Sequence, residues 1–334
     1  MNNILLNPGP TNTLECVKNA QTQHSDICHR TDEFIDLLVE TKSLLLERFS
    51  TTCKSEDWNV SIFGGSGTSA MEALISSLLD KSNILIAGKY GKRAADIMSV
   101  YGVESEKHYL SSQNELEKIT ISNWCTNLYF VENETTTGEK FSLKEVTKRF
   151  PKSRLYIDAT SAFGATDYSD YVDHIDAISF CSNKCLQSTP GLGIVIWRKS
   201  LPMRDKSYYL NLRRYIGNSL PFTLPVQSVA ALNCALKESR ISEHAMNYRR
   251  DRLIDDLSKI NIKCISRFPS NSIIGFVHPN KNYEELKVYL KKRNIIIYNG
   301  IENIKNSFRL STMSVEFDNK YDFILKALND SCIY

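Results

Sequence analysis

Two side chains with reactive groups follow buried strands that the sequence predicts in the middle of the chain. Lys184 comes shortly after the apolar run at residues 177–180, and Asp158 ends the run at residues 154–157. Ligands of open α/β sheets bind at the carboxyl ends of strands. A partly buried lysine loses pKa and can act as a Schiff-base amine. The plainer alternatives are a solvated surface lysine and a carboxylate that caps a helix or turn.

A glycine-rich loop precedes an amphipathic helix in the first third of the chain. The loop reads GGSGTS at residues 64–69, and the predicted helix spans residues 69–79. Glycines let the backbone approach a ligand closely, and the N–H groups at a helix start favour a phosphate. Ser66 and Thr68 add hydroxyl groups. A capped helix after a turn is the alternative, and the loop matches neither common nucleotide-binding motif.

The order of these three features points to one cofactor. Pyridoxal 5′-phosphate needs an anion cradle for its phosphate, an acid that keeps its pyridine nitrogen protonated, and an amine for its aldehyde. A phosphate-binding loop, then Asp158, then Lys184 supplies these groups in turn. The sequence therefore predicts a pyridoxal phosphate site.

The elements that must position these groups alternate between strand and helix up to about residue 200. Apolar runs predict buried strands at residues 83–87, 127–131, 154–157, 177–180 and 193–197, and amphipathic runs predict helices at 69–79 and 143–150. This alternation is typical of an α/β fold. Beyond residue 220 the pattern predicts a small α+β domain, with a helix at 226–260, strands at 272–277, 295–298 and 307–311, and helices at 283–293 and 321–330.

Composition argues against several classes of protein. The 334 residues carry a net charge of +3 without a basic stripe, which disfavours a nucleic-acid partner. The nine cysteines form no CxxC pair, so neither a disulfide framework nor a metal site is expected. No apolar run is long enough to cross a membrane, and the apolar run among the first residues is too short for a secretory signal. We expect a cytoplasmic enzyme without a membrane partner.

Short segments along nearly the whole chain resemble the class V pyridoxal-phosphate aminotransferases of fold type I. These segments are LLNPGPTNT at 5–13, DICHRTDEF at 26–34, GGSGTSAMEA at 64–73, ENETTTGE at 132–139, YIDATSAFGA at 156–165, SNKCLQSTPGLG at 182–193, FTLP at 222–225 and FRLS at 308–311. DICHR, ETTTG and NKCLQ resemble the 2-aminoethylphosphonate–pyruvate transaminase branch. The stretch at 199–221 departs from this pattern, because it is short and lacks the expected tryptophans.

The resemblance implies roles around the cofactor ring. Lys184 would bind the cofactor aldehyde and then move the proton as the catalytic acid and base. Asp158 would pair with the pyridinium nitrogen, and Thr160 belongs to the same cofactor-binding motif. Thr136 would hydrogen-bond the ring side of the cofactor. Tyr90 would stack on the ring, with ordinary core packing as its alternative.

Further roles concern the cofactor phosphate. By resemblance, Ser66, Gly67 and Thr68 would hold the phosphate, and Asn183 would contact it from beside the catalytic lysine. Thr223, in FTLP, would be supplied by the partner subunit. This last role implies a homodimer with shared active sites.

The substrate side is assigned by the same resemblance. Arg309, in the FRLS segment, would clamp the substrate carboxylate, since a guanidinium binds carboxylates bidentately; a surface salt bridge is its alternative. Gly9 would line the pocket with its backbone. Arg30 is a candidate phosphonate partner, and His29 is a core, interface or active-site histidine.

The resemblance implies a large domain with a mainly parallel seven-stranded sheet flanked by helices. It would span residues 15–222, with a small α+β domain at 223–334 and an N-terminal segment, 1–14, near the active site. The expected reaction converts 2-aminoethylphosphonate and pyruvate into phosphonoacetaldehyde and L-alanine, or the reverse. An alanine– or serine–glyoxylate-type aminotransferase is the main alternative, and a cysteine desulfurase-like lyase or a binding protein on the same fold are others.

Overall fold

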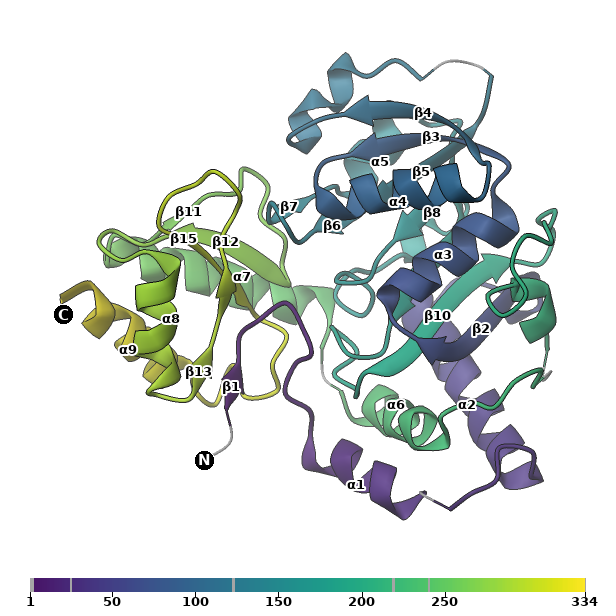
Figure 1. Cartoon of the computed structure of the whole chain (residues 1–334), viewed down its shortest axis with the longest axis horizontal. Coiled ribbons are helices and arrows are strands. Elements are labelled where there is room, and N and C mark those ends of the chain that lie inside the picture. The colour runs from purple at the N-terminus through teal and green to yellow at the C-terminus, as the bar shows by residue number, and fades with distance from the viewer. Residues whose placement is uncertain (1–2, 25, 122–123, 218–219, 240, 334) are drawn as a thin grey trace.

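The computed structural model of the chain describes residues 3–24, 26–121, 124–217, 220–239 and 241–333. Figure 1 shows a large part built around one sheet and a smaller part, coloured green to yellow, that carries the C-terminal helices. The N-terminal strand runs beside the smaller part before the chain enters the larger one. The expected α/β fold with a small α+β part is confirmed.

Within the described residues, the central sheet has seven strands. In spatial order they are β2 (Trp58–Gly65), β10 (Gly191–Arg198), β9 (Ile175–Cys181), β8 (Arg154–Asp158), β5 (Asn127–Val131), β3 (Lys81–Ile86) and β4 (Glu104–Tyr109). The strands from β9 to β4 pair in parallel, whereas β10 is antiparallel to both of its neighbours. β8 ends at Asp158, and β9 ends shortly before Lys184. Because these two strands are parallel neighbours, their carboxyl ends meet at one edge of the sheet.

Helices cover both faces of this sheet. The helices of one face are α3 (Gly67–Leu78) and α4 (Lys89–Val100), and those of the other are α2 (Asp32–Phe49), α5 (Leu143–Arg149) and α6 (Val226–Glu238). Along β10, Ile194 and Ile196 pack into one core, and Val195 and Trp197 pack into the other. Because both faces of β10 are covered, its residues from Leu192 to Trp197 are all buried, and this stretch is apolar.

Two strands of the central sheet were not expected from the sequence. β4, at the edge of the sheet, reads ESEKHY and keeps several polar side chains exposed or half-buried. β2 contains a tryptophan, an asparagine and a serine among its buried residues. Neither strand shows the continuous apolar run that identified the others.

The single helix expected at residues 226–260 is wrong, because the structure has two helices there. α6 ends at Glu238, and α7 (Glu243–Lys259) starts after Ser242, whose side chain accepts a hydrogen bond from the Ala245 N–H. A serine in this N-cap position favours a new helix start. α6 packs on α1 (Glu15–Gln23) and on the large sheet's core, whereas α7 packs on the small sheet. The two cores thus divide after α6.

The smaller part contains its own antiparallel sheet. Its order is β11 (Lys263–Cys264), β12 (Ile273–Val277), β15 (Ser307–Ser311) and β14 (Tyr298–Asn299), and it packs against α7, α8 (Tyr283–Lys291) and α9 (Tyr321–Ile333). The N-terminal strand β1 (Ile4–Leu5) pairs in parallel with β13 (Ile295–Ile296), and Leu6 is buried in the small core. Residues 1–2 of the expected N-terminal segment lie outside the described residues.

The remaining elements are short. The 3₁₀-helices are η1 (Ser55–Asp57), η2 (Gln113–Lys118), η3 (Ser169–Tyr171) and η4 (Leu212–Tyr215), and β6 (Asn133–Glu134) pairs with β7 (Glu139–Lys140) as a hairpin. Residues 218–219 of the altered 199–221 stretch lie outside the described residues. None of the helices in the described ranges combines the length and the apolar character needed to span a membrane.

Candidate active site

A cavity of about 850 Å³ lies between the two parts of the molecule. The start of α4 and the turn after β6 form its wall on the large side, and the β14–β15 region forms the wall on the small side. Pro8 of the N-terminal segment also lines it. Five of the predicted residues meet here, namely Gly9, Tyr90, Thr136, Lys184 and Arg309.

Lys184 lies in the turn after β9 and extends toward the N-terminal segment. Its Nζ donates a hydrogen bond to the Pro8 carbonyl oxygen. A Cβ atom on Gly9 would lie 2.8 Å from the Lys184 Cδ, so only a glycine fits at this distance. Burial lowers the pKa of Lys184, against the opposing influence of Cys181, Cys185 and Asp158. The amine is thereby brought closer to its neutral, nucleophilic form.

Asp158 is buried at the end of β8, with 2% of its surface exposed. Its Oδ1 accepts hydrogen bonds from the Thr160 N–H at 2.9 Å and the Thr160 hydroxyl at 2.5 Å. Burial raises the pKa of Asp158 to about 6, although both bonds from Thr160 act to lower it. No hydrogen-bond donor among the described residues pairs with Oδ2. The free oxygen is available to a positively charged ligand group.

The predicted phosphate loop forms the start of α3. The Ser66 side chain accepts a hydrogen bond from the Ser69 N–H, and the Ser69 hydroxyl donates to the Ser66 carbonyl oxygen. A Cβ on Gly67 would lie 2.8 Å from Thr160 Cγ2, so the loop touches the turn that holds Asp158. Backbone N–H groups at the start of a helix attract anions. The loop and the carboxylate are therefore adjacent, as a single cofactor site requires.

Tyr90 lies in the first turn of α4 and lines the cavity. The guanidinium of Arg93 stands over the Tyr90 ring, 4.8 Å from its centroid, and its Nη1 donates to the Thr68 hydroxyl at 2.9 Å. Arg93 also lines the cavity. Sequence reasoning missed this arginine, although it stands three residues after Tyr90, one helical turn away.

The Thr136 hydroxyl already has partners in this structure. It donates to Glu134 Oε1 at 2.5 Å and accepts from the Lys89 N–H at 3.1 Å. A hydroxyl has one proton to donate, so Thr136 can offer the cofactor only an acceptor lone pair while this arrangement holds. Glu134 is another residue that sequence reasoning missed. It stands in the ENETTTGE segment, but nothing in the segment alone marks that carboxylate as buried.

Arg309 is buried on β15, with 5% of its surface exposed. It donates to Asn299 through Nε and Nη2 and to the Thr135 carbonyl oxygen through Nη1. Its guanidinium lies 4.9 Å from the centroid of the Tyr298 ring. In the described part of the chain no carboxylate forms an ion pair with it. A buried cation without such a partner is suited to an anionic ligand.

Other predicted residues lie outside this cavity. Thr223 is exposed and lines a separate hollow of about 640 Å³ together with Cys28 and His29. The His29 Nε2 is buried and has no hydrogen-bond partner among the described residues. Arg30 is exposed and lines neither hollow. Asn183 is half-buried beside Lys184 but is not among the cavity residues.

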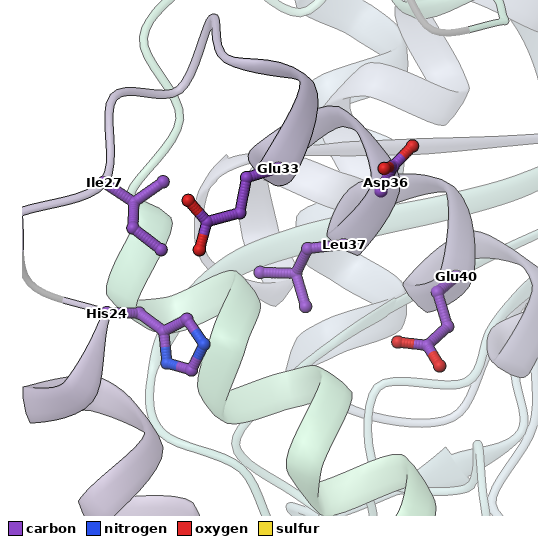
Figure 2. Close-up of a pocket in the computed structure, with 6 residues that line it drawn as sticks. All are labelled: His24, Ile27, Glu33, Asp36, Leu37 and Glu40. Atoms are coloured by element: carbon purple, nitrogen blue, oxygen red, sulfur yellow. The ribbon is translucent and has the colours of Figure 1, made fainter.

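A further surface hollow lies between the end of α1 and α2, with a volume of about 430 Å³. Figure 2 shows His24 and Ile27 facing Leu37 and the acidic side chains Glu33 and Glu40 of α2. None of the predicted site residues lines it. Within the described ranges no group of three or more His, Cys, Asp or Glu side chains is arranged to hold a metal ion.

Comparison with known proteins places these features in context. No family model matches the chain. It is 28% identical to a 2-aminoethylphosphonate–pyruvate transaminase of Bacteroides fragilis, over 93% of each chain, and 28% identical to one of Bacillus cereus, over 93% of this chain and 92% of that one. The chain is thus similar to aminotransferases in sequence over nearly its whole length, and it resembles the class V enzymes, as expected from the sequence.

Solved structures show the same fold. An aspartate aminotransferase from Thermus thermophilus superimposes with a TM-score of 0.85 at 23% identity, over 98% of both chains. An alanine–glyoxylate aminotransferase from Nostoc gives 0.85 at 22% identity, over 99% of this chain and 95% of that one. A phosphoserine aminotransferase from Trichomonas vaginalis has the same fold at 16% identity, with a TM-score of 0.79, and was solved with pyridoxal phosphate bound, which is the cofactor expected here from the sequence. The described residues fit it: Asp158 offers a free oxygen, Lys184 is a desolvated amine, and Gly67 keeps the helix start open.

Proposed function

We propose that this protein is an aminotransferase that exchanges an amino group between 2-aminoethylphosphonate and pyruvate. The observation that carries the proposal is the position of Arg309, a buried arginine without a carboxylate partner among the described residues, in the same cavity as Lys184. The named relatives support the choice of the phosphonate substrate. Each substrate of this reaction carries an anionic group that a guanidinium can bind.

The residues around the cavity would hold the cofactor in a defined orientation. Ser66, Gly67 and Thr68 would bind its phosphate at the start of α3, where N–H groups and the helix dipole favour anions. Tyr90 would contact its ring, and Asp158 Oδ2 would bind its ring nitrogen. When bound, pyridoxal phosphate supplies the electron-withdrawing ring that makes the amino exchange possible.

Lys184 is the residue that would move the proton. Burial lowers the pKa of its amine, so Nζ can accept a proton from the substrate carbon and return it. Cys185, next in sequence, does not compete for this role, because burial raises the pKa of its thiol to about 12. The Pro8 carbonyl oxygen, which accepts a hydrogen bond from Nζ, orients the amine toward the cavity.

The charge around the cavity suits a doubly charged substrate. Lys89, Lys92 and Arg93 line the wall formed by α4, and Arg309 lies on the opposite wall. Glu302 is the carboxylate that lines the same cavity, and it pairs with Lys89 at 3.2 Å. A cavity lined by an excess of one charge raises the local concentration of ligands of the opposite charge. A phosphonate dianion gains more from this field than a carboxylate does.

We also propose a homodimer that shares its active sites. Thr223 is exposed and lies in a different hollow from Lys184 within one chain. If Thr223 binds the cofactor phosphate, the site that it serves belongs to a second copy of the chain. Arg30 is also exposed, so it would reach substrate only in the active site of a second copy of the chain.

A second candidate is an alanine–glyoxylate type of aminotransferase. The Nostoc enzyme with this name has the same fold over nearly the full length of both chains. Arg309 would bind an amino acid carboxylate as readily as a phosphonate. The two candidates differ in the amino donor and in the acceptor, pyruvate or glyoxylate, so activity with each pair of donor and acceptor decides between them.

A panel of amino donors tests the proposal. Purified protein loaded with pyridoxal phosphate is incubated with pyruvate and one donor at a time, and alanine is measured. We expect alanine from 2-aminoethylphosphonate and little from serine or aspartate. Alanine as the donor with glyoxylate as the acceptor tests the second candidate in parallel. Lys184→Ala is the control for background, and equal rates with ordinary amino acids would refute the phosphonate assignment.

A further inference from the structure

A buried carboxylate lies directly behind the cavity wall. Glu134, at the end of β6, has no exposed surface. The described residues place no cationic side chain within ion-pair distance of it. Burying a charge is costly unless it is hydrogen-bonded on several sides. The hydrogen-bond donors around Glu134 therefore indicate which segments this buried carboxylate holds together.

Both oxygens of Glu134 accept hydrogen bonds, and the donors come from two separate segments. Oε2 accepts from the N–H groups of Tyr90 and Gly91 at 3.1 and 3.2 Å, in the first turn of α4. Oε1 accepts from the N–H and the hydroxyl of Thr136 at 3.2 and 2.5 Å. The first N–H groups of a helix lack partners within the helix, and a carboxylate there is stabilised by the helix dipole.

The two segments are packed as closely as their atoms allow. A Cβ on Gly88 would lie 2.5 Å from Glu134 Cδ and 2.5 Å from the Thr136 hydroxyl oxygen. The Lys89 N–H donates to that same hydroxyl at 3.1 Å. Residues of both segments, among them Tyr90 and Thr136, line the cavity. A shift of the carboxylate would thus change the position of both segments of this wall.

We propose that Glu134 is a positioning residue for the cofactor, an inference that rests on the proposed cofactor site. Its carboxylate holds the start of α4 against the turn at Thr136 and so fixes where the Tyr90 ring lies. It does not touch the reacting atoms. It also accepts the hydrogen bond that the Thr136 hydroxyl donates, so that Thr136 can face the cofactor only as a hydrogen-bond acceptor.

Glu134→Gln is the informative substitution because an amide cannot replace the carboxylate here. The carboxylate accepts from four donors through two oxygens, whereas an amide has one oxygen and an NH₂ group that donates. In either orientation the NH₂ group faces N–H groups of the α4 start or of Thr136. At least one backbone donor is left without its partner, and the wall segment must move.

Glu132→Gln is the matched control. Glu132 is equally buried two residues away, but it accepts from the hydroxyls of Thr166 and Tyr168 and does not line the cavity. Both variants remove one buried carboxylate from the same segment. A loss that comes only from stability would therefore appear in both, whereas a positioning role would appear in Glu134→Gln alone.

The test measures the dissociation constant of pyridoxal phosphate, the visible circular dichroism of the bound cofactor and the thermal unfolding of both variants. For Glu134→Gln we expect at least about tenfold weaker cofactor binding, which is the effect of one hydrogen bond to a charged group, and altered visible dichroism. Glu132→Gln should bind the cofactor as the wild type does. Equal cofactor affinity and dichroism in Glu134→Gln and the wild type would overturn the inference.

Glu134→Asp keeps the test decisive if the glutamine variant does not fold. It keeps both acceptor oxygens but shortens the side chain by one carbon, so we expect weaker cofactor binding than in the wild type. Wild-type binding in this variant would also overturn the inference. A wild-type protein that binds no pyridoxal phosphate would instead contradict the proposed function itself.

Discussion

Arg309 and Thr135 join the two parts of the molecule across the cavity. The Arg309 Nη1, on the small sheet, donates to the carbonyl oxygen of Thr135, in the turn after β6, at 2.5 Å. Nε and Nη2 donate to Asn299. A guanidinium has five N–H groups, so one remains free on each terminal nitrogen. The arginine proposed to bind the substrate is thus held in place by protein contacts and still has two donors to offer.

Arg309→Lys should weaken substrate binding more than it weakens the chemical step. Lysine keeps the positive charge but cannot form the forked pair of hydrogen bonds. We expect kcat/KM for pyruvate to fall by roughly 10- to 100-fold, corresponding to the loss of one or two charge-assisted hydrogen bonds. Steady-state kinetics with varied pyruvate measures this. Arg249→Lys is the control, since Arg249, on α7, pairs with Asp318, donates to the Thr312 carbonyl oxygen and does not line the cavity. An unchanged KM in Arg309→Lys would contradict the substrate-binding role.

Asp158→Asn should stabilise the cofactor-free protein and impair the enzyme. Burial raises the pKa of Asp158 to about 6, above the ordinary value of 3.8. Between these pH values the folded state binds more protons than the unfolded state, so this group lowers stability as pH rises from about 4 to about 6. Above pH 6 the buried charge of Asp158 lowers the free energy of unfolding by about 3 kcal/mol, at about 1.4 kcal/mol for each pKa unit.

Thermal or denaturant unfolding of the cofactor-free proteins at pH 4 and pH 8 checks this prediction. The gain in the free energy of unfolding of Asp158→Asn over the wild type should be small at pH 4 and near its full size at pH 8. Turnover should fall at least about a hundredfold, since an amide cannot stabilise the charged ring nitrogen. A variant that is no more stable than the wild type at pH 8 would show that the carboxylate is not strained by burial.

Much of the fold and part of the site follow from local sequence patterns. Lys184 and Asp158 each follow an apolar run, and the structure places both at carboxyl ends of neighbouring strands. The glycine loop directly precedes a helix, as the pattern predicted. Such features depend on residues that are close in sequence, so one sequence is enough to detect them.

The features that were missed depend on contacts between distant segments. The carboxylate of Glu134 becomes significant only because α4 starts next to it, 44 residues earlier in the chain. Arg93 reaches Thr68 from a different helix, 25 residues away. β4 is an edge strand with exposed polar side chains, so its sequence lacks the apolar pattern of a central strand. Tertiary packing rather than local pattern determines all three.

Gly9→Ala should displace Lys184. A Cβ at this position would lie 2.8 Å from Lys184 Cδ, and the Gly9 φ angle of +132° is one that residues with side chains rarely adopt. We expect loss of most of the visible absorption of the bound cofactor. Gly102→Ala is the control, because Gly102 also has a positive φ, +62°, but has no atom within 4 Å of an added Cβ. That variant should lose about 1 kcal/mol of stability and keep the absorption. Wild-type absorption in Gly9→Ala would show that the close approach is not needed.

Mixed dimers test whether Thr223 serves the partner's active site. Thr223→Glu places a negative charge at the proposed phosphate contact, and Lys184→Ala removes the amine proposed to be catalytic, so each variant alone should be inactive. If Thr223 acts across the interface, a dimer with one subunit of each kind has one intact site and one site with both defects. Random exchange at equal concentrations makes half of the dimers mixed, so we expect about a quarter of wild-type activity to return.

The control for this experiment pairs Lys184→Ala with Arg309→Ala. Lys184 and Arg309 line the same cavity of one chain. In a mixed dimer of these two variants every site carries one defect, unless Arg309 also acts across the interface, so no activity should return. Recovery with Thr223→Glu but not with Arg309→Ala would assign Thr223 to the partner's site and Arg309 to its own. No recovery in either mixture, with subunit exchange confirmed by differently tagged chains, would contradict the shared site.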